Sequence, residues 1–208
     1  MITIYGWSIS KYFAALALHS NSSTMLVGAH AVSQSRTMQG NARTVHVFIA
    51  SPGDVEERDL VKDAMTEWNV ENTKYRNIVF IPELWEINST SDSRGRAQGQ
   101  INKKLLDPCD VLIALFWKKT GTPTKVAQSG TIEEITRFHK TKKRVCLFFC
   151  ERPLEWRVKK TLIEAAKVLD LRQKMHSVDA GIIDYYGTPE SLQVKLRRLF
   201  NDIAREYE

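Results

Sequence analysis

Apolar residues gather into five short runs along this chain. The runs cover residues 45–50, 78–84, 111–117, 144–150 and 181–185. Each has the length of a β-strand, and the run at 111–117 is apolar at every position, which is typical of a parallel strand that is covered on both faces. Most of the segments between the runs show helical spacing, so strands alternate with helices. This pattern predicts an α/β fold in which a five-stranded parallel sheet lies between two layers of helices.

End signals and periodicity place the helices. Asp54 is expected to cap a helix after the first strand, and the inner face of that helix carries Leu60, Val61, Ala64, Met65 and Trp68. A long amphipathic helix with a basic face is predicted over 154–171, and a final helix over 189–207 has an apolar face formed by Leu192, Leu196, Leu199, Phe200 and Ile203. The polar segment 85–99 is expected to be a loop, and its length is that of functional loops such as active-site lids.

The segment after the third strand carries the most informative local pattern. Gly121 and Gly130 interrupt the regular structure, and Thr131 is expected to cap the helix that follows. Glu133 and Glu134 then fall in the first turn of this helix. The helix dipole stabilises a carboxylate there, and α/β proteins bind ligands beside the carboxyl ends of parallel strands. Glu134, with Glu133 as the alternative, is therefore the first candidate for chemistry.

Short motifs between residues 44 and 143 occur in the order found in bacterial TIR-like domains, and the chain resembles that group. The motifs are Ser51-Pro52-Gly53-Asp54-Val55 with Glu56-Glu57-Arg58, then Trp85-Glu86, Gln98-Gly99-Gln100-Ile101-Asn102, Asp110-Val111-Leu112-Ile113, Phe116-Trp117, Gly121-Thr122-Pro123 and Ser129-Gly130-Thr131-Ile132-Glu133-Glu134-Ile135. The Gly-Thr-x-x-Glu element is also similar to nucleoside deoxyribosyltransferases and related N-glycosidases. No single motif is highly specific, and the ordered combination carries the resemblance.

The resemblance implies a fold and an activity. Both families have a flavodoxin-like three-layer α/β sandwich, and in both the functional glutamate lies on the helix after the third strand, which aligns with Glu134. The TIR-like resemblance implies an NAD+ glycohydrolase that cleaves the bond between nicotinamide and ribose in bacterial defence against phage. It also implies activation by assembly into a homo-oligomer. Either a separate sensor or activator protein supplies the trigger, or this protein responds to a signal directly.

The substrate is expected at the crevice where the loops after the first and third strands meet. Trp85 and Trp117 offer flat surfaces for a base or nicotinamide, and a positively charged ring gains further from cation–π attraction. Arg94 and Arg96 could grip a diphosphate. The expected substrate-binding residues are Ser51, Pro52, Gly53, Asp54, Trp85, Glu86, Arg94, Trp117, Thr120 and Glu133.

A site with a single catalytic carboxylate suits NAD+ better than an ordinary nucleoside as substrate. Breaking an N-glycosidic bond develops positive charge on the sugar, and a carboxylate held nearby can stabilise or attack it. A pyridinium leaving group needs no protonation, whereas an ordinary nucleoside usually needs a second acid. Two alternatives stay open. One is an N-glycosidase or deoxyribosyltransferase that acts on a nucleoside or nucleotide. The other is a TIR-like module without enzymatic activity that binds a nucleotide or another protein.

Composition narrows the cofactors and partners. The formal net charge of +6 permits anionic ligands, but the basic residues are spread along the chain, which indicates a solvated surface and not a nucleic-acid site. The three cysteines, Cys109, Cys146 and Cys150, have no metal-binding spacing and fit a reduced cytoplasmic protein. We expect no metal and no cofactor, with NAD+ as the substrate.

Residues 1–43 differ from the rest, since they contain no Asp or Glu and show no sustained period. We expect a flexible or partly helical extension ahead of a single domain at 44–208. The alternatives are a translated region upstream of a start at Met38, or a signal peptide. The compact apolar run at 12–18 is shorter than the ~20 residues that a membrane span needs, so no membrane partner is expected.

Overall fold

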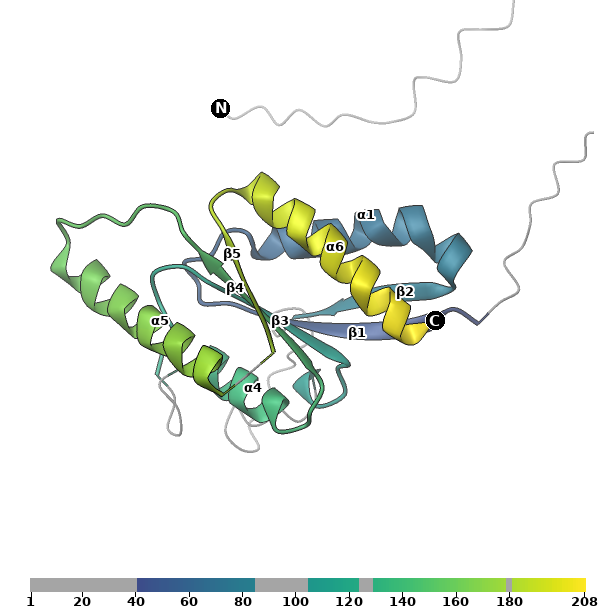
Figure 1. The fold of residues 1–208 in the computed structure, drawn as a ribbon, viewed down its shortest axis with the longest axis horizontal. Coiled ribbons are helices and arrows are strands. Elements are labelled where there is room, and N and C mark those ends of the chain that lie inside the picture. The colour runs from purple at the N-terminus through teal and green to yellow at the C-terminus, as the bar shows by residue number, and fades with distance from the viewer. Residues whose placement is uncertain (1–40, 85–104, 124–128, 179–180) are drawn as a thin grey trace, which may run out of the picture. The chain divides into compact units, whose positions relative to one another are not determined.

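The computed structural model of the protein describes residues 41–84, 105–123, 129–178 and 181–208. Within these ranges it shows a five-stranded sheet in the order β2-β1-β3-β4-β5, and every neighbouring pair of strands is parallel (Figure 1). The order 2-1-3-4-5 is the flavodoxin-like one. The predicted three-layer α/β sandwich with a five-stranded parallel sheet is therefore confirmed.

The strands and helices alternate as the sequence predicts. The strands are β1 (Arg43–Ala50), β2 (Ile78–Glu83), β3 (Val111–Phe116), β4 (Arg144–Cys150) and β5 (Ile182–Tyr186). The helices are α1 (Arg58–Arg76), α4 (Gly130–His139), α5 (Lys159–Ser177) and α6 (Pro189–Tyr207). The bounds of β4 and α6 are those predicted, and β1 begins two residues earlier than expected.

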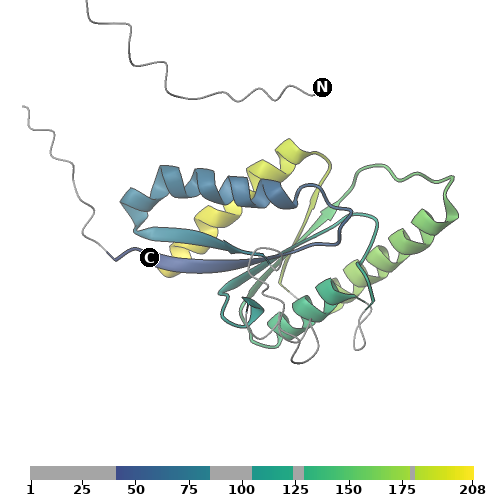
Figure 2. The same ribbon diagram turned by 180° about the vertical axis from the view of Figure 1, so that it is seen from behind.

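Helices cover both faces of the sheet. Helices α1 and α6 lie on one face, and α4 and α5 lie on the other, as the two opposite views show (Figures 1 and 2). Alternate residues of β1 enter the two cores, Val47 and Ile49 on the α1–α6 side and Phe48 and Ala50 on the α4–α5 side. Because both faces are buried, the strands need apolar residues at consecutive positions, which explains the continuous runs in the sequence.

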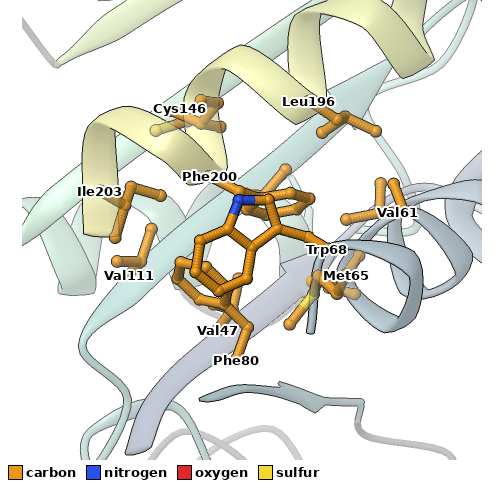
Figure 3. Packing of buried hydrophobic residues seen from close by; sticks show 14 of the residues in the cluster. Val47, Val61, Met65, Trp68, Phe80, Val111, Cys146, Leu196, Phe200 and Ile203 are labelled. Carbon is orange, nitrogen blue, oxygen red and sulfur yellow. The ribbon is translucent and has the colours of Figure 1, made fainter. Parts of the chain in front are cut away.

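The core on the α1–α6 side is built around Trp68 (Figure 3). The Trp68 ring meets Phe80 of β2 edge to face at 4.7 Å, and Phe80 in turn lies 5.1 Å from Phe200 of α6. The indole N–H of Trp68 donates a hydrogen bond of 3.0 Å to Asn201. Helix α1, strand β2 and helix α6 are thus joined by aromatic packing in which the polar atom of the indole also has a partner.

Two predicted helix caps are wrong. Helix α1 begins at Arg58, and the Asp54 carboxylate instead accepts a 3.2 Å hydrogen bond from the backbone N–H of Lys118. The cap of α4 is Ser129, whose hydroxyl oxygen accepts a hydrogen bond from the Ile132 N–H at 3.1 Å, and Thr131 lies inside the helix. In the first case the Asp54 side chain, which local sequence would use as a cap, instead bonds to the segment that follows β3.

Two other predicted elements are displaced along the chain. Helix α5 starts five residues later than predicted and continues six residues further, to Ser177, because Met175 is buried and extends the inner face. Strand β5 starts at Ile182, one residue later than predicted. Gly181 has a φ of +119°, and a Cβ there would come within 2.3 Å of the Val145 carbonyl oxygen, so this position forms the turn into the strand.

Several predictions lie outside the described residues. They are the extension over residues 1–40, the loop at 85–99 and its proposed action as a lid, and the site residues Trp85, Glu86, Arg94 and Arg96. In the part of the chain that the structure describes, no helix is both long and apolar enough to span a membrane.

Candidate functional site

All five strands end at the same edge of the sheet, which we call the carboxyl edge. The segments 51–57, 117–123 and 151–158 follow β1, β3 and β4 there. Strand order reverses between β1 and β3, because β2 lies on one side of β1 and β3 on the other. The loops after these two strands therefore flank the position where open α/β sheets bind ligands.

Buried polar side chains are concentrated at the start of α4. Thr120, Ser129, Thr131 and Glu134 are each no more than 7% exposed, and we call these four residues the α4 polar cluster. Among the described residues, Glu57 is the only other polar or charged residue that is buried to this degree. Polar groups are usually buried only when they are hydrogen-bonded or functional, so this concentration distinguishes the start of α4 from the other described helices.

The loop after β3 approaches closely the two cluster residues at the start of α4, Ser129 and Thr131. A Cβ at Gly121 would come within 3.2 Å of the Ser129 side chain and 3.5 Å of the Thr131 hydroxyl, and the Gly121 φ is +103°. The Gly130 N–H also donates a 3.2 Å hydrogen bond to the Thr122 carbonyl oxygen. Glycine at 121 thus allows the loop to turn and to approach the helix closely.

Glu134 and Glu133 occupy different environments. Glu133 lies in the first turn of α4 and is half-buried, whereas Glu134 follows it at the start of the second turn and is buried. Glu134 lies on the helix face that also carries Thr131 and Phe138, at i−3 and i+4, both of them buried. Our expectation that both carboxylates lie in the first turn is therefore correct only for Glu133, and the helix dipole acts less strongly at Glu134.

The loop after β1 lines a depression of about 390 Å³. Three of the four predicted residues of this loop, Ser51, Pro52 and Gly53, contribute to its wall, together with Val55, Glu56, Arg58, Asp59, Lys62 and Leu84. The fourth predicted residue, Asp54, reaches toward Lys118 through one carboxylate oxygen, and the other oxygen is buried with no hydrogen-bond partner among the described residues. Asp54 thus connects the loop after β1 to the end of β3.

Trp117 packs against two cations at the end of β3. The Lys118 Nζ lies 3.9 Å from the centroid of the indole ring, and the Arg152 Cζ lies 4.3 Å from it. The indole N–H donates to the Arg152 carbonyl oxygen at 3.3 Å. The use of Trp117 as a stacking surface for substrate stays a prediction. In the arrangement described here two cations already lie against that ring.

An ion pair that no sequence motif predicts joins the loops after β1 and β4. The Glu57 carboxylate is 4% exposed and accepts from the Arg152 guanidinium, with Nη2 to Oε1 and Oε2 distances of 2.8 and 3.1 Å. The Arg152 Nε donates to the Cys150 sulfur at 3.1 Å. The partners come from loops far apart in sequence, so no local motif indicates them. The one sequence signal for the ion pair is that Glu57 and Arg152 each lie in a segment that follows a parallel strand.

Tyr186, the last residue of β5, lies near Cys150 and Glu57. It is 2% exposed, and among the described residues its hydroxyl has no hydrogen-bond partner. Burial, followed by the nearby Cys150 and Glu57, raises the pKa of this phenol well above its ordinary value. Tyr186 is therefore neutral at physiological pH.

The described residues contain no group of three His, Cys, Asp or Glu side chains that could hold a metal ion. Two of the three cysteines are unsuited to act as nucleophiles. Burial raises the pKa of Cys109 and of Cys146 to about 12, so both are protonated thiols near neutral pH. The carboxylate of the α4 polar cluster is the stronger candidate for chemistry.

Comparison with known proteins identifies no family. No protein-family model and no curated protein matches the chain. Among solved structures, S. aureus homoserine dehydrogenase at pH 6.0 is 10% identical with a TM-score of 0.38, covering 70% of this chain and 33% of its own. The same enzyme at pH 7.0 is 11% identical with a TM-score of 0.37, covering 69% of this chain and 32% of its own. The chain spans about a third of the length of these structures. A likeness this low carries no argument about function, and the resemblance to TIR-like domains stays a prediction.

Proposed function

We propose that the protein is an NAD+ glycohydrolase in which Glu134 is the catalytic carboxylate. The observation that carries the proposal is the burial of Glu134 within the α4 polar cluster, beside the carboxyl end of β3. Removing a carboxylate from water costs several kcal/mol unless the surroundings compensate for it. A glutamate kept in such a position, where α/β folds bind ligands, is a candidate for function.

The proposed reaction needs one carboxylate and one water molecule. The bond between ribose C1′ and the nicotinamide nitrogen breaks, and its electron pair goes to the nitrogen and neutralises the pyridinium. The ribose takes on oxocarbenium character, which the Glu134 carboxylate stabilises by its negative charge. Water then attacks C1′ and loses a proton to the carboxylate or to solvent. The products are nicotinamide, ADP-ribose and one proton.

The wider biology of the proposal comes from the sequence resemblance. It comprises a role in defence against phage, activation by assembly of a homo-oligomer, and a separate sensor or activator protein. The proposed cytoplasmic location comes from the three cysteines, which have no metal-binding spacing.

Release of nicotinamide from NAD+ tests the proposed function. Purified protein at high concentration, with and without a crowding agent, is compared with Glu134→Gln and with the matched variant Glu133→Gln. We expect Glu134→Gln to lose at least about 100-fold in rate, because it removes the charge that stabilises the transition state. Glu133→Gln should lose much less of the rate than Glu134→Gln, because Glu133 is half-buried in a different environment and is predicted to bind substrate and not to stabilise the transition state.

The folded state of each variant is checked by circular dichroism and by the thermal unfolding midpoint. Glutamine has nearly the shape of glutamate, so both variants should stay folded. A wild-type protein that releases no nicotinamide under either condition would contradict the proposal. So would a folded Glu134→Gln variant that keeps the wild-type rate.

A further inference from the structure

We propose that Lys118 and Arg152 form a binding site for the diphosphate of a nucleoside diphosphate. We call these two residues the cation pair. The inference extends the proposed function, since it names the residues that hold the phosphate half of the substrate. The residues predicted for that role from the sequence, Arg94 and Arg96, lie outside the described residues.

The geometry brings the two positive charges together. The Lys118 Nζ and the Arg152 Cζ lie 3.9 and 4.3 Å from the same point, the centroid of the Trp117 ring. The two cations therefore cannot be further apart than the sum of these distances. This is within the reach of a diphosphate, which carries its negative charge on two linked phosphoryl groups.

The local charges do not balance. Glu57 neutralises Arg152, but among the described residues no carboxylate lies within ion-pairing distance of the half-buried Lys118 ammonium. The Asp54 carboxylate accepts from the Lys118 backbone N–H and not from its ammonium group. Lys118, Arg152 and Glu57 together therefore carry one excess positive charge, which an anion bound at this position would balance.

Both cations are held in place before a ligand arrives. Arg152 uses Nε for the Cys150 sulfur and Nη2 for Glu57, and among the described residues its Nη1 has no acceptor. Nη1 can therefore donate to a phosphoryl oxygen, and such a charge-assisted hydrogen bond is stronger than a neutral one. The Lys118 main chain is fixed by Asp54. A site whose groups are already positioned binds with less loss of conformational entropy.

The cation pair also lies in a suitable place along the chain. Lys118 and Arg152 follow β3 and β4 at the carboxyl edge, and Thr120 of the α4 polar cluster is two residues beyond Lys118. A dinucleotide that presents its nicotinamide ribose to Glu134 would thus carry its diphosphate toward the same loop. The ligand class is therefore a nucleoside diphosphate, free or as half of a dinucleotide.

Calorimetric titration with ADP tests this inference without any turnover. Adenosine serves as the probe that lacks phosphate. Lys118→Gln is the main variant, since the Lys118 side chain has no ion pair with any residue that the structure describes. Lys140→Gln is the matched control, because Lys140 is an exposed lysine at the C-terminal end of α4, which lies at the opposite edge of the sheet. We expect Lys118→Gln to weaken ADP binding about tenfold or more and to leave adenosine unchanged, since a charged hydrogen bond is lost. Lys140→Gln should bind ADP as the wild type does.

Arg152→Lys gives a second readout. It keeps the charge beside Glu57 but removes the guanidinium fork, and it should weaken ADP binding while the fold is retained. Equal weakening by Lys118→Gln and Lys140→Gln would overturn the inference, as would the absence of ADP binding to the wild type at millimolar concentration. ADP binding that depends on Lys118 in a protein that releases no nicotinamide would support the cation pair and contradict the proposed activity, so the two failures are distinguishable.

Discussion

Trp68 and Trp117 lie in two regions of this domain that differ in the polarity of their buried groups. Around Trp68 the residues are apolar, the ring is 2% exposed, and the indole N–H has a partner in Asn201. Around Trp117, at the carboxyl edge, the ring is half-buried against two cations, and polar groups are enclosed beside it. Two of these groups, one Asp54 oxygen and the Tyr186 hydroxyl, have no hydrogen-bond partner among the described residues.

The difference distinguishes residues that stabilise the fold from residues that are candidates for ligand binding or catalysis. Buried apolar area around Trp68 stabilises the native state, whereas buried polar and charged groups at the carboxyl edge reduce the stability that the same volume of apolar side chains would give. Such groups are commonly kept where they bind ligands or do chemistry. Substitutions around Trp68 should therefore mainly lower stability, whereas substitutions at the carboxyl edge should mainly lower ligand binding or reaction rate.

The largest effect on stability is expected from Trp68→Ala. The substitution opens a cavity between α1, β2 and α6 and leaves the Asn201 side chain without its donor, so the free energy of unfolding should fall by roughly 3–5 kcal/mol. Urea denaturation measures this. Trp117→Ala is the comparison variant. It should cost clearly less, because the ring is half-buried. Equal losses for the two tryptophans would show that the carboxyl edge is as much a part of the core as Trp68.

A smaller loss is expected when the Glu57–Arg152 ion pair is broken. Arg152→Met leaves the Glu57 carboxylate buried without its partner, and we expect a loss of roughly 2–3 kcal/mol, less than for a fully buried pair because the Arg152 side chain is 27% exposed. The double variant Glu57→Leu/Arg152→Met removes both charges and should recover most of this loss. A double-mutant cycle in urea measures the coupling. No recovery in the double variant would mean that the network stabilises by packing and not by charge.

Alkaline pH should weaken the apolar cores through their buried thiols. Cys109 and Cys146 have pKa values of about 12 in the folded state and ionise near 9.0 when unfolded. A pKa raised by folding stabilises the native state fully below pH 9 and loses that contribution as the pH rises toward 12. The loss should be about 1.4 kcal/mol per thiol for each pH unit above 9. Urea denaturation at pH 8 and pH 10.5 measures it, and Cys146→Ala should flatten the slope. An unchanged slope in that variant would assign the alkaline loss to other groups.

The smallest effect is expected at the cap of α4. Ser129→Ala removes the hydroxyl that accepts from the Ile132 N–H, which should cost about 1 kcal/mol. Thr188→Ala at the cap of α6 is the matched control, since its hydroxyl accepts from the Ser191 N–H. Both should lower the thermal midpoint by similar amounts, but only Ser129→Ala should also lower nicotinamide release. Release that is unaffected by Ser129→Ala would separate this cap from the site.

Much of this fold is predictable because its signals are local. Consecutive apolar residues predict β3 and β4, and helical spacing with an N-terminal proline predicts α6. One of the two wrong cap predictions arises because a side chain has a distant partner. Asp54 has the residue type of a helix cap, but it bonds to the Lys118 main chain instead.

The candidate site shows the same division. Motif order and the position of the loop after β3 predict Glu134 and Thr120 as site residues, and their roles stay predictions. The pairing of Glu57 with Arg152 and the position of Arg152 over Trp117 depend on the order of the strands in space. No spacing in the sequence indicates these contacts, because each joins loops that follow different strands.

Amide hydrogen exchange with and without ADP-ribose tests directly whether the carboxyl edge binds the ligand. We expect slower exchange at the carboxyl edge, in segments 51–58, 117–122 and 129–134, with little change in the core around Trp68. Protection that appeared instead in the depression of about 540 Å³ between α1 and α6 would contradict a ligand site at the carboxyl edge. That depression is lined by Ala64, Glu67, Glu190, Gln193, Val194, Arg197, Arg198 and Asn201.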